Sequence, residues 1–104
     1  MESSGRFMAI PKLSGQANYE IWALRIKAVL IEKGLSDFLL PANSLSTEDM
    51  TPESAKLVQV NANRALALIQ LSLQDGPLLQ IRHFQTPLDA WTALRELYSP
   101  KGFS

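Results

Sequence analysis

The sequence predicts an all-α fold, a compact bundle of about five helices around one long central helix that covers about residues 52–73. Apolar residues recur at helical spacing in several stretches, and strand-like alternation is nowhere sustained. Thr-Pro pairs at Thr51 and Thr86 are typical of helix starts, because the threonine caps and the proline suits the first helical position. The 104 residues leave room for one domain, and an apolar content of 46% allows a buried core.

The composition argues against several classes of protein. The formal net charge is zero and no basic run is present, so nothing suggests binding to nucleic acid through counterion release. The chain has no cysteine, which excludes disulfides, thiolate metal sites and cysteine nucleophiles. No apolar run approaches the ~20 residues that a membrane span needs, and the first residues do not resemble a signal peptide.

Residues 1–12 are expected to form a flexible arm, because serine, glycine and proline interrupt any period there. The first helix is predicted over 18–33, with Asn18 as its cap and Gly34 just after its end. We expect its buried face to hold Tyr19, Trp22, Ile26, Val29 and Leu30, and to be widened by Ile21, Leu24, Ala28 and Ile31.

The remaining elements follow from caps and breakers. A short helix or turn is predicted over 35–39, and the polar residues 41–51 are predicted to form a surface loop. The long helix comes next, and its end after Ala65 is apolar in nearly every direction, so we expect that end to be buried on all sides. Pro77 opens a predicted helix over 77–84. The last helix covers 87–98, and Asp89 lies close to a capping-box position.

No residue pattern indicates catalysis, a cofactor or a metal, so the chain is not expected to be an enzyme. His83 is the only histidine, and no partner lies at a motif spacing from it. The glycine-rich phosphate-binding patterns and the G-x-S-x-G nucleophile pattern are absent. Trp22 and Trp91 could line a ligand pocket, but both lie on apolar helical faces and fit a core better.

Two stretches, residues 13–24 and 66–98, resemble the amino-terminal capsid region of the Gag polyprotein of copia-type long-terminal-repeat retrotransposons. The first carries a Leu, Gly, Asn-Tyr and Trp pattern. The second carries an I-x-L-S-L helix end followed by a helix that begins at Thr, has Trp five residues later, and closes on Leu and Tyr. The matching residues are Leu13, Gly15, Asn18, Tyr19, Trp22, Ile69, Leu71, Ser72, Leu73, Thr86, Trp91, Leu94 and Tyr98.

The resemblance implies a structural protein that self-associates into a virus-like particle shell around element RNA, in the cytoplasm. It implies a helical capsid domain over 13–98, with 99–104 as a shortened linker to a second capsid domain that this sequence lacks. Contact with RNA would be indirect, since the family's zinc knuckle needs cysteines. The main alternative is a repurposed Gag-derived module that binds a partner peptide or helix in a hydrophobic groove, which residues 6–13 could themselves fill.

Two polar helix surfaces are candidates for contacts between copies. The first helix carries charges of both signs that can complement a neighbour, namely Glu20, Arg25, Lys27 and Glu32. The start of the long helix carries Lys56, Gln59 and Asn63. For each residue the alternative is an ordinary solvated position. Because shell contacts gain strength from multiplicity, we expect the isolated chain to be a monomer or a weak oligomer.

Overall fold

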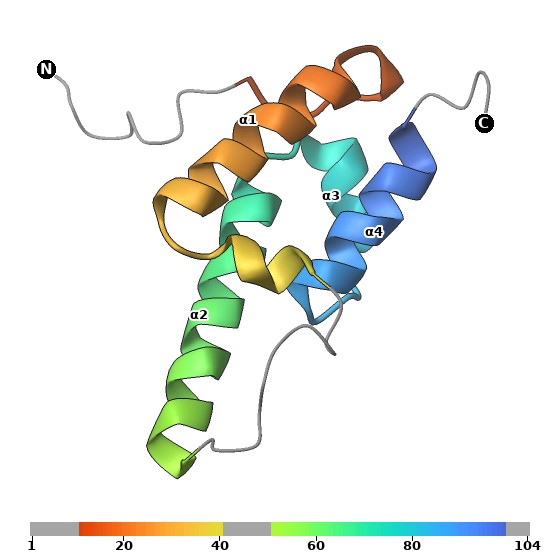
Figure 1. Cartoon of the computed structure of the whole chain (residues 1–104). Helices are drawn as coiled ribbons and strands as arrows, with labels where there is room; N and C mark the ends of the chain where they lie inside the picture. Colours follow the sequence, from red (N-terminus) through yellow and green to blue (C-terminus); the bar gives the residue numbers. More distant parts are fainter. Residues whose placement is uncertain (1–10, 41–50, 100–104) are drawn as a thin grey trace, which may run out of the picture.

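Four α-helices make up most of the part of the chain that the computed structural model describes, residues 11–40 and 51–99 (Figure 1). They are α1 (Tyr19–Glu32), α2 (Pro52–Leu71), α3 (Asp75–Ile81) and α4 (Pro87–Tyr98). Two short 3₁₀ helices, η2 (Gln16–Asn18) and η3 (Ser36–Leu39), flank α1. Within the described residues the predicted all-α class is confirmed. The structure does not describe residues 1–10, 41–50 and 100–104. Most of the predicted arm, surface loop and linker therefore lies outside the described residues.

Threonine caps begin α2 and α4, as the sequence predicts. The Thr51 hydroxyl accepts a hydrogen bond from the backbone N–H of Ser54 at 3.0 Å. The Thr86 hydroxyl accepts one from Asp89 at 3.2 Å. In each case a proline follows in the first turn, where a missing N–H costs nothing. Local chemistry therefore fixes where both helices start.

A left-handed glycine ends α1. Gly34 has a φ of 71°, which lets the Leu35 N–H reach the Leu30 carbonyl at 2.7 Å and the Gly34 N–H reach the Ile31 carbonyl at 3.0 Å. This pair of bonds is the Schellman motif, in which the residue after the glycine also packs back onto the helix. Leu30 and Leu35 are both buried, so the motif turns the chain directly into the core.

Three predicted elements differ from the structure. The described part of the chain has four α-helices rather than five, because residues 36–39 form a single turn of 3₁₀ helix instead of a second α-helix. The short predicted helix begins at Asp75, two residues before the proline, and ends at Ile81. The long helix ends at Leu71 because Leu73 pairs with Leu13 in an isolated parallel β-bridge.

The long helix is also not central. Its first half is exposed almost throughout and projects beyond the other elements (Figure 1). The prediction that its second half is buried on every side is wrong as well, because Leu71 and Ala67 are exposed. Only one stripe of that half, which includes Ala65 and Ile69, lies in the core. The helix borders the domain instead of crossing it.

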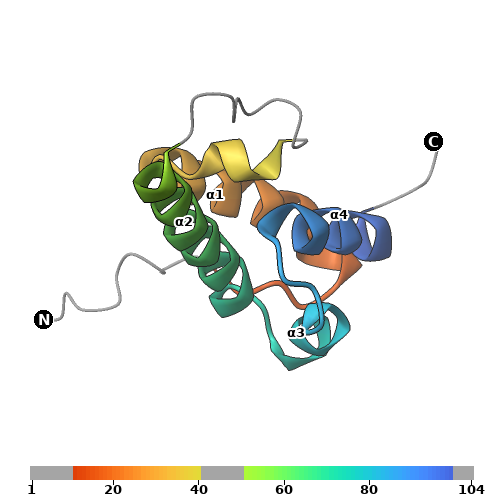
Figure 2. The same ribbon diagram turned by 90° about the horizontal axis from the view of Figure 1, so that it is seen from below.

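The core lies where α1, the second half of α2, and α4 converge. α4 packs against α2, α3 and η3, and α1 packs against α2 and η3. Seen from below, η3 and α3 lie on opposite sides of the molecule (Figure 2). The buried cluster is Leu13, Tyr19, Trp22, Ile26, Leu30, Leu35, Ala65, Leu68, Ile69, Leu73, Ile81, Ala90 and Leu94.

Candidate assembly surface

A buried hydrogen-bonded junction joins three segments that are distant in sequence. The Trp22 Nε1–H donates to the Ser72 carbonyl at 3.0 Å and to the Ser72 hydroxyl at 3.1 Å. The Ser72 hydroxyl in turn donates to the Ile69 carbonyl. The backbone N–H of Leu13 donates to the same Ser72 carbonyl at 2.9 Å. Because a buried indole N–H needs an acceptor, this junction fixes α1 against the end of α2.

Asn18 organises the turn before α1 and does not cap the helix through its side chain. Its Oδ1 accepts hydrogen bonds from the backbone N–H groups of Ser14 and Gly15, at 3.0 and 3.3 Å. Its amide donates to the Lys12 carbonyl at 3.0 Å. The sequence correctly places Asn18 at the N-cap position, but the side chain bonds backwards and secures the segment that delivers Leu13 to the junction. Gly15 has an extended backbone conformation that any residue can adopt, so a left-handed turn does not explain the glycine at this position.

Three aromatic rings form a row with the most buried ring, Trp22, in the middle. The ring centroids of Tyr19 and Trp22 are 5.8 Å apart, and those of Trp22 and Trp91 are 5.6 Å apart. Trp22 is 1% exposed, whereas Trp91 is half-buried. Burial raises the pKa of the Tyr19 phenol, and the nearby charge of Arg95 partly opposes that shift. The row is therefore a packing feature, and only its Trp91 end is half-buried.

The outward side of α1 carries an apolar stripe. Ile21, Leu24 and Ile31 are 48%, 66% and 58% exposed, and Ala28 between them is exposed too. Successive residues of a helix turn by about 100°, which places this stripe opposite the face that carries Trp22 into the core. The helical spacing predicts that these four residues widen the buried face, and that prediction is wrong. A helix with apolar residues on two faces cannot bury both against one domain.

Charges of both signs border the stripe. They are the residues predicted as the first candidate surface, Glu20, Arg25, Lys27 and Glu32, and all four are exposed. Among the residues that the structure describes, none of the four has an ion-pair or hydrogen-bonded side-chain partner. Their charges are thus available to a neighbouring molecule.

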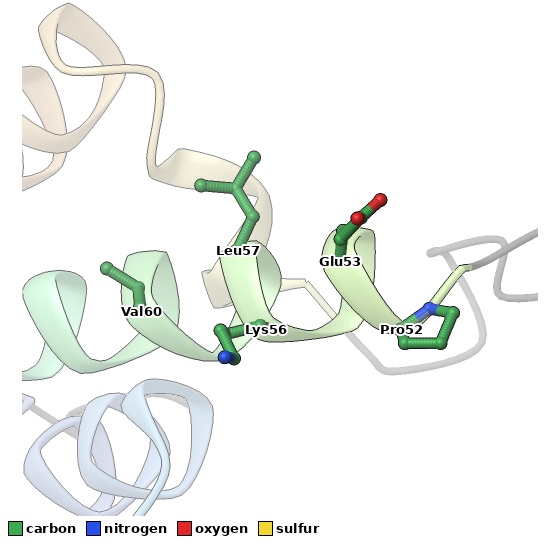
Figure 3. Close-up of a pocket in the computed structure, with 5 residues that line it drawn as sticks. All are labelled: Pro52, Glu53, Lys56, Leu57 and Val60. Atoms are coloured by element: carbon green, nitrogen blue, oxygen red, sulfur yellow. The ribbon is translucent and has the colours of Figure 1, made fainter.

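A second exposed stripe runs along α2. Leu57 and Leu71 are each 59% exposed, and Val60 is 48% exposed. The side chains of Leu57 and Val60 project from successive turns of the helix (Figure 3). The second predicted surface, Lys56, Gln59 and Asn63, lies on the same helix and is exposed. There the Gln59 amide donates to Asn63 Oδ1 at 3.0 Å.

Two shallow hollows adjoin these surfaces. One, of about 460 Å³, lies between α1 and α4 and is lined by Tyr19, Leu24, Lys27, Trp91 and Arg95 among others. The other, of about 360 Å³, lies where η3, α2 and the start of α4 meet, and its lining includes Phe38, Val58, Ala62 and Leu88. Both are open at the surface, so each suits a protruding side chain or a helix edge better than an enclosed small molecule.

Three more residues of the motif differ in their burial. Leu73 and Leu94 lie in the core, whereas Tyr98 is only half-buried at the end of α4. Ser72 also belongs to the motif and is buried, but the sequence indicates no role for its hydroxyl. A serine between two apolar residues gives no local sign of its partner, which is a tryptophan 50 residues earlier.

His83 is exposed and lies against Phe84, with ring centroids 4.2 Å apart. Within residues 11–40 and 51–99, no cluster of three or more His, Asp or Glu side chains could hold a metal ion. In that same part of the chain, every helix is too short or too polar to cross a bilayer.

In comparisons with protein-family models, with curated proteins and with solved structures, no significant match to this chain was found.

Proposed function

We propose that this chain is a structural assembly module, the capsid amino-terminal domain of a copia-type Gag, which self-associates to build the shell of a virus-like particle around element RNA. One observation carries the proposal. Large apolar side chains stand exposed in regular stripes on two different helices, α1 and α2, of a domain whose core is already closed. Exposed apolar faces of this kind are typical of contacts with other protein molecules. A protomer with two such faces can contact two neighbours and so extend into a lattice. A protomer with one self-complementary face can form only a dimer.

The resemblance in sequence motifs supports the same proposal. Its two separated parts come together in space at the junction of Leu13, Trp22 and Ser72. This is what is expected if the motif encodes a fold and not a reaction. In the proposed role the chain has no catalytic residue or cofactor, its partner is a second copy of itself, its particles are cytoplasmic, and it reaches RNA only through other regions of a Gag protein.

The experiment that tests the proposal is electron microscopy of the purified chain as it is concentrated from micromolar to millimolar. Individually weak contacts should yield rings, sheets or particles only when the chain is crowded, because multiplicity supplies the strength. A chain that remains dispersed throughout this range, with no ordered contacts, contradicts the assembly function.

The second candidate function is a peptide-binding module. The hollow between η3, α2 and α4 favours it, since its lining combines Phe38 and Val58 with polar groups such as Gln59 and Thr86. Titration with a library of short apolar peptides tests this candidate. Micromolar capture of one peptide by a chain that never self-associates would favour binding over assembly.

A further inference from the structure

The stripe on α1 has the spacing of a helix that pairs with another helix. Ile21, Leu24, Ala28 and Ile31 are separated by three, four and three residues, which is the a and d spacing of a heptad repeat. All four are exposed, and they occupy the a and d positions of two successive heptads in the order a, d, a, d. The first heptad, with Ile21 at a and Leu24 at d, has the combination that favours a two-stranded pairing, whereas the second has Ala28 at a and Ile31 at d.

In this register the bordering charges occupy the g and e positions. Glu20 and Lys27 fall at g, and Arg25 and Glu32 fall at e. Side chains interact within a single helix when they are three or four residues apart. The four charges include no such pair, so they cannot neutralise one another within α1.

The opposite charges are instead spaced for contact between two helices. Glu20 precedes Arg25 by five residues, and Lys27 precedes Glu32 by five. In a parallel coiled coil, each g residue meets the e residue five positions further along the partner helix, and these contacts set partner choice and orientation. Two copies of α1 in parallel would therefore place opposite charges together at every such position.

From this complementarity we infer that the outer face of α1 is a two-fold contact, and that its occupant is α1 of a second copy of this chain, parallel and in register. Glu20 faces Arg25 of the second copy, Lys27 faces Glu32, and the four apolar residues stack along the axis. The inference rests on the proposed function and names the surface and the partner. Only two heptads take part, so the contact is far smaller than a standard stable interface and is weak by itself.

Two charge-swapped variants test the inference without touching the apolar stripe or the net charge. In Glu20→Lys with Lys27→Glu, both g residues repel the e residues of a like copy. In Arg25→Glu with Glu32→Lys, both e residues repel in the same way. Mixing the two variants restores opposite charges at every position. Sedimentation equilibrium should give each variant alone an association constant about tenfold or more below that of the unmodified chain. The mixture should have the same association constant as the unmodified chain.

Disulfide trapping gives an independent reading of the register. The chain has no cysteine, so Leu24→Cys introduces a single thiol at a d position, which meets its own copy across a parallel two-fold axis. Leu79→Cys is the matched control, since Leu79 is exposed to a similar extent on α3. On mild oxidation Leu24→Cys should dimerise rapidly, and Leu79→Cys should not.

The outcomes separate the inference from the proposed function. If the unmodified chain associates while both swapped variants associate equally well alone, the parallel α1 contact is wrong, and assembly uses another face or an antiparallel pairing. If mixing fails to restore association, the parallel register is wrong. If the unmodified chain does not associate at any concentration, both the inference and the assembly function fail.

Discussion

Trp22 links the two halves of the fold at the level of single residues. Its ring is buried and its N–H is bonded to Ser72, whereas Trp91 packs on it from a half-buried position. We therefore expect Trp22→Ala to lower the free energy of unfolding by about 3–5 kcal/mol, and Trp91→Ala by clearly less. Urea unfolding of the matched pair measures both. Equal losses would mean that Trp91 is as well packed as Trp22.

The Ser72 hydroxyl has a smaller role that can be measured separately. Ser72→Ala removes one acceptor of the Trp22 N–H and the hydroxyl donor to the Ile69 carbonyl, but the Ser72 carbonyl remains as the other acceptor of the Trp22 N–H. The expected loss in the free energy of unfolding is about 1–2 kcal/mol, the range of two buried hydrogen bonds. Ser54→Ala is a control, because Ser54 is exposed on α2 and its backbone N–H keeps the bond to Thr51. A loss for Ser72→Ala no larger than for the control would contradict the junction.

Because of the raised pKa of Tyr19, we expect the free energy of unfolding to fall at alkaline pH. Its folded pKa is raised by burial, so above about pH 10 the unfolded chain ionises this phenol before the folded chain does. The contribution of Tyr19 to the free energy of unfolding is constant below the pKa of the unfolded chain. It is lost as the pH rises through the pKa of the folded chain. Urea midpoints at about pH 8 and about pH 10.5 should differ less for Tyr19→Phe than for the unmodified chain. An identical decline in both proteins would exclude Tyr19 as the cause.

At the level of the elements, helix ends were predictable because their signals are local. Thr51, Thr86 and Gly34 each act within a few residues, and all three appear in the structure in the roles that the sequence predicts. The junction was not predictable in the same way, since the partnership of Trp22 and Ser72 depends on how distant segments meet. The outward stripe of α1 was misassigned for a related reason: periodicity identifies apolar faces but not which of them the domain covers.

Gly34 and Gly76 give opposite predictions for the same substitution. Gly34→Ala places a Cβ in the left-handed region and should destabilise the fold by about 1 kcal/mol. Gly76 lies in α3, has open space around its Cα, and has no left-handed conformation, so Gly76→Ala should be neutral or slightly stabilising. Thermal unfolding of the two variants compares them directly. Destabilisation by both would point to packing rather than conformation.

The two threonine caps should differ in their effect. α4 carries Ala90 and Leu94 into the core, so Thr86→Ala should lower global stability by about 1 kcal/mol. Thr51 caps the exposed half of α2, which can fray without disturbing the core. Thr51→Ala should therefore speed hydrogen exchange near Ser54 with little change in global unfolding. A large global loss for Thr51→Ala would mean that this half of α2 is integral to the domain.

For the whole molecule, charge balance predicts weak binding to nucleic acid. The net charge is zero, and α1 carries two acidic and two basic residues. Single-stranded RNA should bind no more tightly than about 10⁻⁴ to 10⁻⁶ M at physiological salt, the non-specific range. Fluorescence anisotropy measures this. Submicromolar binding would require a local basic patch, and Arg25, Lys27, Arg64 and Arg82 are the residues to substitute first.

The central claim is that this domain associates with its own copies through exposed apolar helix faces, and sedimentation velocity over a dilution series tests it most directly. The unmodified chain should show an apparent mass that rises from that of a monomer as the concentration approaches millimolar. A variant with Leu24→Gln and Ile31→Gln on α1 and with Leu57→Gln and Val60→Gln on α2, all at exposed positions, should remain folded and stay monomeric over the same series. A constant monomer mass for the unmodified chain, or an identical rise for both proteins, would contradict the claim.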